Sequence, residues 1–223
     1  MKLITPKSIA HALGLKKLSF LNGFISWLIF RVCKLDQCNK LLIKNKQKEK
    51  LDFVSGLLHS LKINYQINES DLNKVPKDGA FVAIANHPLG AIDGLLMMHI
   101  LGKKRKDLKI FGNYVLHDIE PLQKLIFPVN PFSNSNGFSG GKKGIISAIS
   151  QLRSGSPVGV FPAGEVATKR NGSNITRVDG PWNDKILKLL IQENVPILPV
   201  YFHGRNSRLF YFLSKINPVL LVV

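Results

Sequence analysis

Residues 80–94 read Ala-Phe-Val-Ala-Ile-Ala-Asn-His-Pro-Leu-Gly-Ala-Ile-Asp-Gly, an apolar run followed by a turn that contains a histidine and then an aspartate. The first six residues have the length and composition of a buried strand. His87 and Asp93 cannot meet on one regular helix, because at about 100° per residue positions six apart lie on different sides. They can meet if Pro88–Gly90 turns the chain and Asp93 lies at the start of the next helix, a turn that Gly90 would permit.

A histidine that contacts a carboxylate can act as a general base. Its imidazole titrates near neutral pH and can take a proton from a hydroxyl or an amine. The carboxylate fixes the tautomer and stabilises the imidazolium that forms. Alternatively, His87 is only a turn residue and Asp93 only a helix N-cap, for which aspartate is favoured. The pair by itself leaves both interpretations open, although functional groups concentrate in loops between strands and helices.

Strand-like and helix-like segments alternate along most of the chain. We expect strands at Ala80–Ala85, Lys109–Asn113, Val158–Phe161 and Ile197–Phe202, and helices at Glu49–Leu61, Asp93–Leu101, Gln123–Phe127, Lys143–Leu152 and Asn183–Glu193. This alternation predicts an α/β fold: a single domain with a largely parallel central sheet flanked by helices. Sites in such sheets lie beyond the carboxyl ends of the strands, so His87 and the segment Phe161–Glu165 should face one cleft.

Two later segments complete a set of motifs. Residues 157–166 read Pro-Val-Gly-Val-Phe-Pro-Ala-Gly-Glu-Val, and residues 195–204 read Val-Pro-Ile-Leu-Pro-Val-Tyr-Phe-His-Gly. With Asn-His-Pro-Leu-Gly-x-x-Asp-Gly, they resemble, in the same order, the motifs of the lysophospholipid and glycerol-phosphate acyltransferase superfamily. Three ordered motifs are far more specific than one short pattern. Five residues separate His87 from Asp93, where most of the superfamily has four, and this resembles the bacterial hemolysin-like or ornithine-lipid acyltransferase branch.

The resemblance implies an enzyme that transfers a fatty acyl group from a thioester to the hydroxyl of a lyso-lipid, in membrane lipid biosynthesis. The acceptor would be a lyso-amino-lipid or 1-acylglycerol-3-phosphate. His87 would take the acceptor's proton, and Asp93 would hold His87. Backbone N–H groups near Gly90 or Gly164 are expected to stabilise the oxyanion. No metal or bound cofactor is expected, because the thioester carbonyl is already activated; the donor would be acyl carrier protein or coenzyme A carrying the acyl group.

A further set of residues is expected to bind substrate: Asn86, Gly90, Lys142, Lys143, Phe161, Pro162, Gly164 and Glu165. The Phe-Pro segment resembles the Phe-Pro-Glu-Gly-Thr block that binds the acceptor's polar head, but Ala163 replaces its Glu and Glu165 replaces its Thr. The glycine-rich segment 130–144 ends at the start of a helix with Lys142 and Lys143, which suits a phosphate or carboxylate. The structural alternative is a flexible loop with a solvated lysine pair.

The formal net charge is +17, from 31 lysines and arginines against 14 aspartates and glutamates. Such a charge indicates an anionic partner, and nucleic acid and anionic lipid are the two candidates. We find no helix-turn-helix signature, zinc spacing or RNP-like aromatic strand, so we expect no nucleic acid partner. The acidic acyl carrier protein would also suit a basic surface. Scattered lysine is equally what a solvated surface contains.

The apolar stretch 18–33 predicts an N-terminal amphipathic helix. It is shorter than the roughly 20 apolar residues that span a bilayer, and basic residues flank it. This favours a helix lying in the headgroup region of an anionic membrane, although a helix packed on the core is the alternative. We therefore divide the chain into an N-terminal helical membrane-association region, 1–60, and an acyltransferase domain, 61–223. The expected location is peripheral (monotopic), on the cytoplasmic face of the bacterial inner membrane.

Other features bear on compartment and on rival functions. No small-residue cleavage site follows the apolar stretch, so we expect no cleaved signal peptide. Cys33 and Cys38 fit free thiols in a reducing compartment. Relatives in the superfamily generally continue past Val223, so the chain is expected to be short. The alternative functions are an N-acyltransferase acting on an amino acid and a non-catalytic basic protein that binds membrane or nucleic acid.

Overall fold

The computed structural model describes residue 5 and residues 20–32, 34–117, 119–129, 142–168 and 179–216. Its centre is a five-stranded sheet in the order β3-β2-β4-β1-β5, in which every pair of neighbours is parallel. The strands are β1 (Val82–Ala85), β2 (Lys109–Asn113), β3 (Ile126–Val129), β4 (Val158–Val160) and β5 (Ile197–Val200). The expected α/β domain with a parallel sheet is confirmed.

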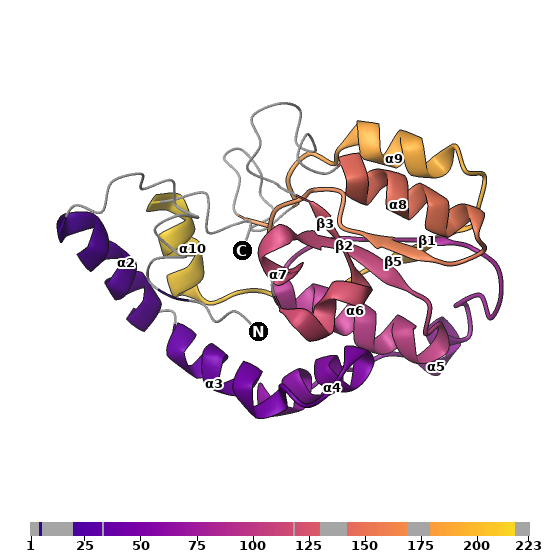
Figure 1. The fold of residues 1–223 in the computed structure, drawn as a ribbon. Coiled ribbons are helices and arrows are strands. Elements are labelled where there is room, and N and C mark those ends of the chain that lie inside the picture. Colours follow the sequence, from indigo (N-terminus) through magenta and orange to yellow (C-terminus); the bar gives the residue numbers. More distant parts are fainter. Residues whose placement is uncertain are drawn as a thin grey trace.

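Helices cover both faces of this sheet (Figure 1). One face carries α4 (Lys50–Ser60), α6 (Ala91–Lys104) and the 3-10 helix η1 (Glu120–Leu125), and the other carries α8 (Lys142–Arg153) and α9 (Asp184–Ile191). The chain leaves β1 past β4 toward β2 through α6, and leaves β4 past β1 toward β5 through α9, so these neighbouring strands are followed by helices on opposite faces. Such a switch point, between β1 and β4, is where parallel α/β sheets place their sites.

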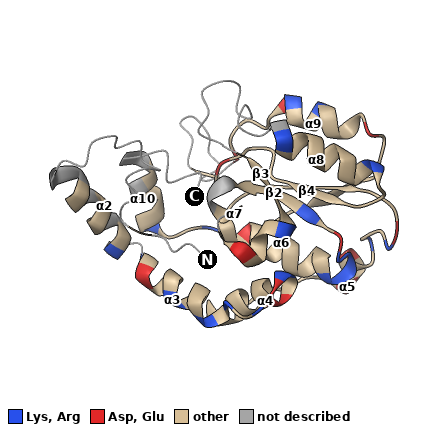
Figure 2. Ribbon diagram, in the orientation of Figure 1, with Lys and Arg blue, Asp and Glu red and all other residues tan. Residues whose placement is uncertain are grey.

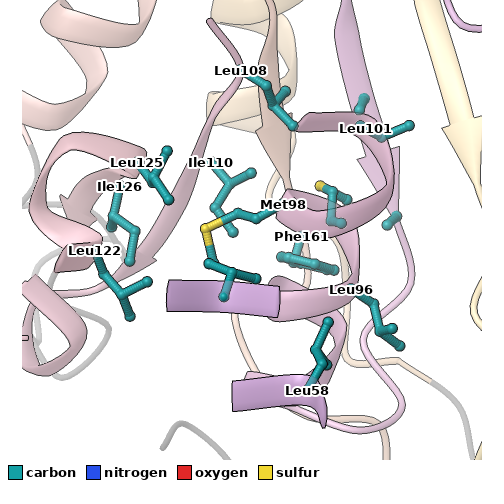
Figure 3. Close-up of a cluster of buried hydrophobic side chains, with 14 of the residues drawn as sticks. Leu58, Leu96, Met98, Leu101, Leu108, Ile110, Leu122, Leu125, Ile126 and Phe161 are labelled. Carbon is teal, nitrogen blue, oxygen red and sulfur yellow. The ribbon is translucent and has the colours of Figure 1, made fainter. Parts of the chain in front are cut away.

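Alternate side chains of each strand enter two separate cores. Around β1, Phe81, Ala83 and Ala85 face α4 and α6, whereas Val82 faces α8 and α9. This alternation follows from the period of two in a strand, and coverage on both sides explains why the strands are almost wholly apolar. Figure 3 shows the first core, where Phe161 lies among side chains of α6 such as Met98.

One predicted helix is present only in part, and four of the described helices were not predicted. Of residues 123–127, the first three end the 3-10 helix η1 and the last two begin β3, in which Ile126 pairs with Ile110 of β2. In so short an apolar run, periodicity does not separate helix from strand, and pairing with β2 decides the outcome. The unpredicted helices are α3 (Leu35–Asn45), α5 (Glu69–Leu72), α7 (Tyr114–His117) and α10 (Arg208–Ile216). The other predicted strands and helices are present within a few residues of their expected bounds.

The N-terminal helices form an arm that leads into the sheet domain (Figure 1). The first, α2 (Phe20–Val32), carries Phe24, Trp27 and Leu28 about half exposed to solvent. In the part of the chain that the structure describes, no helix has the length and apolar character required to cross a membrane. In contrast to α2, α4 buries Phe53 and Val54 completely in the first core, although the division at residue 60 places α4 in the N-terminal region. The membrane role of α2 stays a prediction.

The contact between α6 and β4 gives a test of the packing. A Cβ atom at Gly159 of β4 would lie 2.5 Å from Met97 Sδ and 2.7 Å from Ile110 Cγ2. We expect Gly159→Ala to lower the free energy of unfolding by roughly 1–3 kcal/mol, because an added methyl group must displace α6 or β2. Urea unfolding of the two proteins measures this difference.

The matched control is Gly23→Ala in α2, where a Cβ atom would meet no heavy atom within 4 Å. Alanine has the higher helix propensity, so this variant should be as stable as the wild type or slightly more stable. Equal losses of stability in the two variants would contradict the close approach of α6 to β4.

Candidate active site

The loop between β1 and α6 brings His87 and Asp93 together. Gly90 turns the chain with φ +74° and ψ −130°, a conformation that side-chain-bearing residues rarely adopt, and α6 begins at the next residue. His87 Nδ1 lies 3.1 Å from Asp93 Oδ2. The predicted contact between these side chains is therefore present, and its role in catalysis stays a prediction.

The carboxylate of Asp93 is the centre of this loop. It has no solvent exposure, and its Oδ2 atom also accepts the backbone N–H of Leu89 at 2.7 Å and of Gly90 at 3.1 Å. These three N–H donors offset the cost of burying the charged group. The other oxygen, Oδ1, is buried without a hydrogen-bond partner among the described residues. Because a carboxylate only accepts, His87 carries its proton on Nδ1, and Nε2 is left as the acceptor.

Aromatic packing fixes the plane of the imidazole. Phe161 follows β4, and its ring stacks on that of His87 with 4.3 Å between centroids and 29° between planes. Phe202 follows β5, and the centroid of its ring lies 6.3 Å from that of the Phe161 ring. The His87 side chain keeps 18% of its surface exposed, so a substrate can reach it. The first two sequence motifs meet at the switch point between β1 and β4, as predicted.

Hydrogen bonds from two further directions hold the main chain of residues 86–90, the candidate catalytic loop, which is called the catalytic loop below. The backbone N–H of Ala167 donates to the carbonyl of His87 at 2.8 Å. The side-chain amide of Asn206 donates to the carbonyl of Pro88 at 3.0 Å. The loop is therefore fixed by the segments that follow β4 and β5 as well as by Asp93. A rigid loop is what a positioned base requires.

Asn86 joins the first motif to the third. Its amide donates to the carbonyl of Phe202 at 3.0 Å, and its amide oxygen accepts the N–H of Phe202 at 2.7 Å. Asn86 was expected to bind substrate. In this structure its amide instead extends the pairing of β1 and β5 beyond the strand ends.

The expected oxyanion donors are already engaged. The N–H of Gly90 is bonded to Asp93, and the N–H of Gly164 donates to the carbonyl of Phe161 at 3.0 Å. The N–H of Gly90 serves the buried carboxylate of Asp93, which needs nearby donors. That backbone N–H groups near Gly90 or Gly164 stabilise an oxyanion stays a prediction, and other groups than these two N–H groups would have to do so in this conformation.

Asp179 is a site residue that the sequence did not reveal. Its Oδ1 accepts the backbone N–H of His87 at 3.0 Å, and its Oδ2 accepts the indole N–H of Trp182 at 3.0 Å. Nearby, the N–H of Asn183 donates to the carbonyl of Pro162 at 2.9 Å. The segment 179–183 thus connects the loop of the first motif to that of the second. Its sequence begins Asp-Gly-Pro-Trp, which is typical of a turn. This local pattern does not indicate that Asp179 contacts His87, 92 residues away.

The remaining predicted site residues are less closely placed. Pro162, Gly164 and the half-buried Glu165 share the loop after β4 with Phe161. Lys142 and Lys143 open α8, which follows the edge strand β3, and β2 and β4 lie between β3 and β1. Lys143 is exposed, and no recorded contact joins it to the catalytic loop. The rest of the glycine-rich segment, 130–141, lies outside the described residues. A substrate-binding role for these residues stays a prediction.

Metal-ligating side chains do not gather in threes or more anywhere in the described ranges. The absence of an added metal or cofactor stays a prediction.

Comparison with known proteins identifies the class. A family described as "Acyltransferase" matches residues 11–222, almost the whole chain, so the chain belongs to this acyltransferase family. Its relatives include a protein from Phocaeicola vulgatus and one from Bacteroides thetaiotaomicron, each named lyso-glycine lipid O-acyltransferase. The first is 28% identical over 203 residues, covering 90% of this chain and 69% of the relative. The second is 26% identical over 215 residues, covering 96% and 75%. The resemblance seen in the three motifs is confirmed.

Asp179 should act by positioning His87. We expect Asp179→Ala to lower kcat by about tenfold or more, because a displaced loop moves the base out of line with its substrate. Asp179→Asn should retain more activity, since its amide oxygen can still accept the His87 N–H. The measurement is kcat and KM for acyl transfer, together with the thermal midpoint of each variant.

Asp184→Ala is the control, because Asp184 is an exposed aspartate in the first turn of α9. It should have the turnover of the wild type. If Asp179→Ala also keeps wild-type kcat with an unchanged thermal midpoint, the bond to the His87 N–H does not position the base.

Proposed function

We propose that the protein is an O-acyltransferase that moves a fatty acyl group from an acyl thioester to the hydroxyl of a lyso-lipid, in membrane lipid biosynthesis. The observation that carries this proposal is the contact between His87 Nδ1 and Asp93 Oδ2 at the switch point of the sheet. Membership of an acyltransferase family supports acyl transfer as the reaction. The names of the two relatives support a lyso-lipid acceptor and a hydroxyl nucleophile.

The geometry suits a general-base mechanism. Nε2 of His87 takes the proton of the acceptor hydroxyl while its oxygen attacks the thioester carbonyl. Asp93 Oδ2 stabilises the imidazolium through Nδ1. The tetrahedral intermediate then collapses, its carbon–sulfur bond breaks, and the leaving thiolate takes the proton from Nε2. Phe161 keeps the ring in one plane during both proton transfers.

The oxyanion of this intermediate needs donors other than Gly90 and Gly164. α6 begins immediately after the catalytic loop, and the first N–H groups of a helix have no acceptor within the helix. The N–H groups of Ala91 and Ile92 at this helix start are the candidates for the role. They are close in sequence to His87. They also lie at the N-terminal end of α6, where the helix dipole favours negative charge.

The donor and location follow from charge and exposure. Acyl carrier protein is acidic and coenzyme A carries phosphates, so either thioester suits a chain with a net charge of +17. Figure 2 shows lysines and arginines on most of the described helices. The half-exposed Phe24, Trp27 and Leu28 of α2 suit the interface of an anionic membrane. These features support a peripheral membrane location; we further propose that the enzyme acts on the cytoplasmic face of the bacterial inner membrane and has no nucleic acid partner.

Acylation of an amino-acid amine is the alternative reaction. A histidine base would serve an amine as well as a hydroxyl, so the pair at His87 does not separate the two reactions. The hydroxyl is favoured because both relatives are named O-acyltransferases. A protein that only binds anionic surfaces would have no need of a buried carboxylate oriented on a histidine.

The general base is tested by two substitutions. His87→Ala should abolish acyl transfer, and Asp93→Asn should lower it by roughly 10²-fold or more, the range of general-base steps. In Asp93→Asn the amide oxygen can replace Oδ2, and its NH₂ can take the position of Oδ1, which has no partner among the described residues. Folding should therefore be retained. Thiol release from the thioester in the presence of lyso-lipid measures the rate.

If the thermal midpoints of both variants lie within a few degrees of the wild type, the lost activity reflects the missing catalytic group and not unfolding. Turnover close to the wild type in His87→Ala would exclude His87 as the base.

The acceptor head group is tested at Glu165. The resemblance places a carboxylate two positions later than in glycerophosphate enzymes, and a carboxylate repels phosphate and attracts an amino group. We expect faster turnover with a lyso-amino-lipid, such as a glycine or ornithine lipid, than with 1-acylglycerol-3-phosphate. Glu165→Gln should reduce this preference. A strong preference for 1-acylglycerol-3-phosphate that Glu165→Gln leaves unchanged would show that Glu165 does not select the head group.

A further inference from the structure

α10 presents an apolar face to solvent. Leu209 is 48% exposed and Phe212 is 62% exposed, and a spacing of three residues places them on the same side of the helix. Single exposed apolar residues are ordinary, but two large ones on one face of a short helix indicate a surface that is covered in use. We call Leu209 and Phe212 the α10 face.

The helix that carries this face is joined to the catalytic loop. The chain between β5 and α10 packs on that loop, and a Cβ atom at Gly204 would come within 2.9 Å of Leu89. Asn206 then joins the two elements directly. Its side-chain amide donates to the carbonyl of Pro88 at 3.0 Å, and its backbone N–H donates to Tyr211 Oη of α10 at 3.0 Å. A contact made by α10 is therefore connected to the loop that carries the base by two consecutive hydrogen bonds.

Positive charge adjoins the α10 face. Arg205 and Arg208 are exposed, and neither forms an ion pair with a carboxylate of the described residues. Guanidinium groups next to exposed apolar side chains are the combination that binds anionic lipid, with the apolar groups below the phosphates and the cations at their level. The charge of the whole chain has the same sign.

We infer that α10 docks on an anionic lipid bilayer and thereby places the catalytic loop at its surface. This inference rests on the proposed function, since a lyso-lipid acceptor lies in that bilayer. Leu209 and Phe212 enter the boundary between headgroups and acyl chains, and Arg205 and Arg208 contact lipid phosphates. This surface is separate in sequence from α2 and is joined to His87 through Pro88. Where α2 attaches the protein, α10 orients its active site toward the acceptor.

A second copy of the chain is the less suitable occupant. Stable protein interfaces bury about 1,200 Å² or more in total, and two side chains on a nine-residue helix provide only a small part of that area. A bilayer needs no matching surface, so a small apolar face with flanking cations is sufficient.

The test compares Leu209→Gln/Phe212→Gln with Ile146→Gln in the full-length chain. Ile146 is 66% exposed on α8, which covers the face of the sheet away from α4 and α6, and serves as the matched control. Sedimentation with vesicles of phosphatidylcholine and phosphatidylglycerol in equal amounts measures partitioning. The double variant should partition about tenfold more weakly, because two partly buried apolar side chains are lost, and Ile146→Gln should match the wild type.

Turnover measurements distinguish a loss of membrane docking from a loss of catalysis. The double variant should lose turnover on a lyso-lipid embedded in vesicles but keep wild-type turnover on a short-chain, water-soluble lyso-lipid. Arg205→Gln/Arg208→Gln should weaken binding at low salt and have less effect at high salt, where charge attraction is screened. Phe24→Gln/Trp27→Gln in α2 should weaken binding without lowering turnover per bound molecule.

Three results would overturn the inference. The first is unchanged vesicle binding and vesicle turnover in Leu209→Gln/Phe212→Gln. The second is equal losses in Ile146→Gln. The third is a change from oligomer to monomer in the double variant, which would make the α10 face a contact between copies. Failure of the wild type to acylate the short-chain lyso-lipid would count against the proposed function, whereas vesicle binding tests the role of α10 independently.

Discussion

Three N–H groups converge on one oxygen of Asp93, and the candidate site depends on this interaction. A carboxylate with no solvent exposure is stable only if hydrogen bonds replace the water that it has lost. Here the donors are the backbone of Leu89 and Gly90 and the imidazole of His87. The same oxygen therefore fixes the turn, the start of α6 and the orientation of the base. A glycine at the turn allows the backbone conformation that brings all three donors to it.

The switch in strand order determines which segments can surround that base. β1 and β4 are neighbours, but the helices that follow them, α6 and α9, lie on opposite faces of the sheet, so their two loops meet at the carboxyl edge. His87 and Phe161 stack in the space between them. Asp179 and Asn206 then bind the main chain of the catalytic loop from segments more than ninety residues away. The site is thus assembled from four segments that share only the carboxyl edge of the sheet.

Apolar side chains form both the cores and part of the surface of the molecule. Most of those in the strands and in α4, α6, α8 and α9 fill the two cores, although Ile146 of α8 and Ile191 of α9 are exposed. Those of α2 and the α10 face are exposed instead, and they lie outside the body formed by the sheet and its covering helices (Figure 1). A rigid body that carries exposed apolar side chains on α2 and α10, with α10 bonded through Asn206 to the loop of His87, suits an enzyme whose acceptor is a lipid.

The sequence by itself determined the alternation of strands and helices, because each has a characteristic spacing of apolar residues along a short stretch of the chain. It also indicated that His87 and Asp93 can meet, since a turn with glycine and a helix start lie between them, and the structure has this contact. Only the tertiary structure decided that residues 126–129 form a strand, because pairing with β2 outweighs a short ambiguous pattern. Only it identified Asp179, the use of the Gly90 N–H by Asp93, and the place of α10 beside the loop. These depend on contacts between distant segments, for which one sequence carries no local signal.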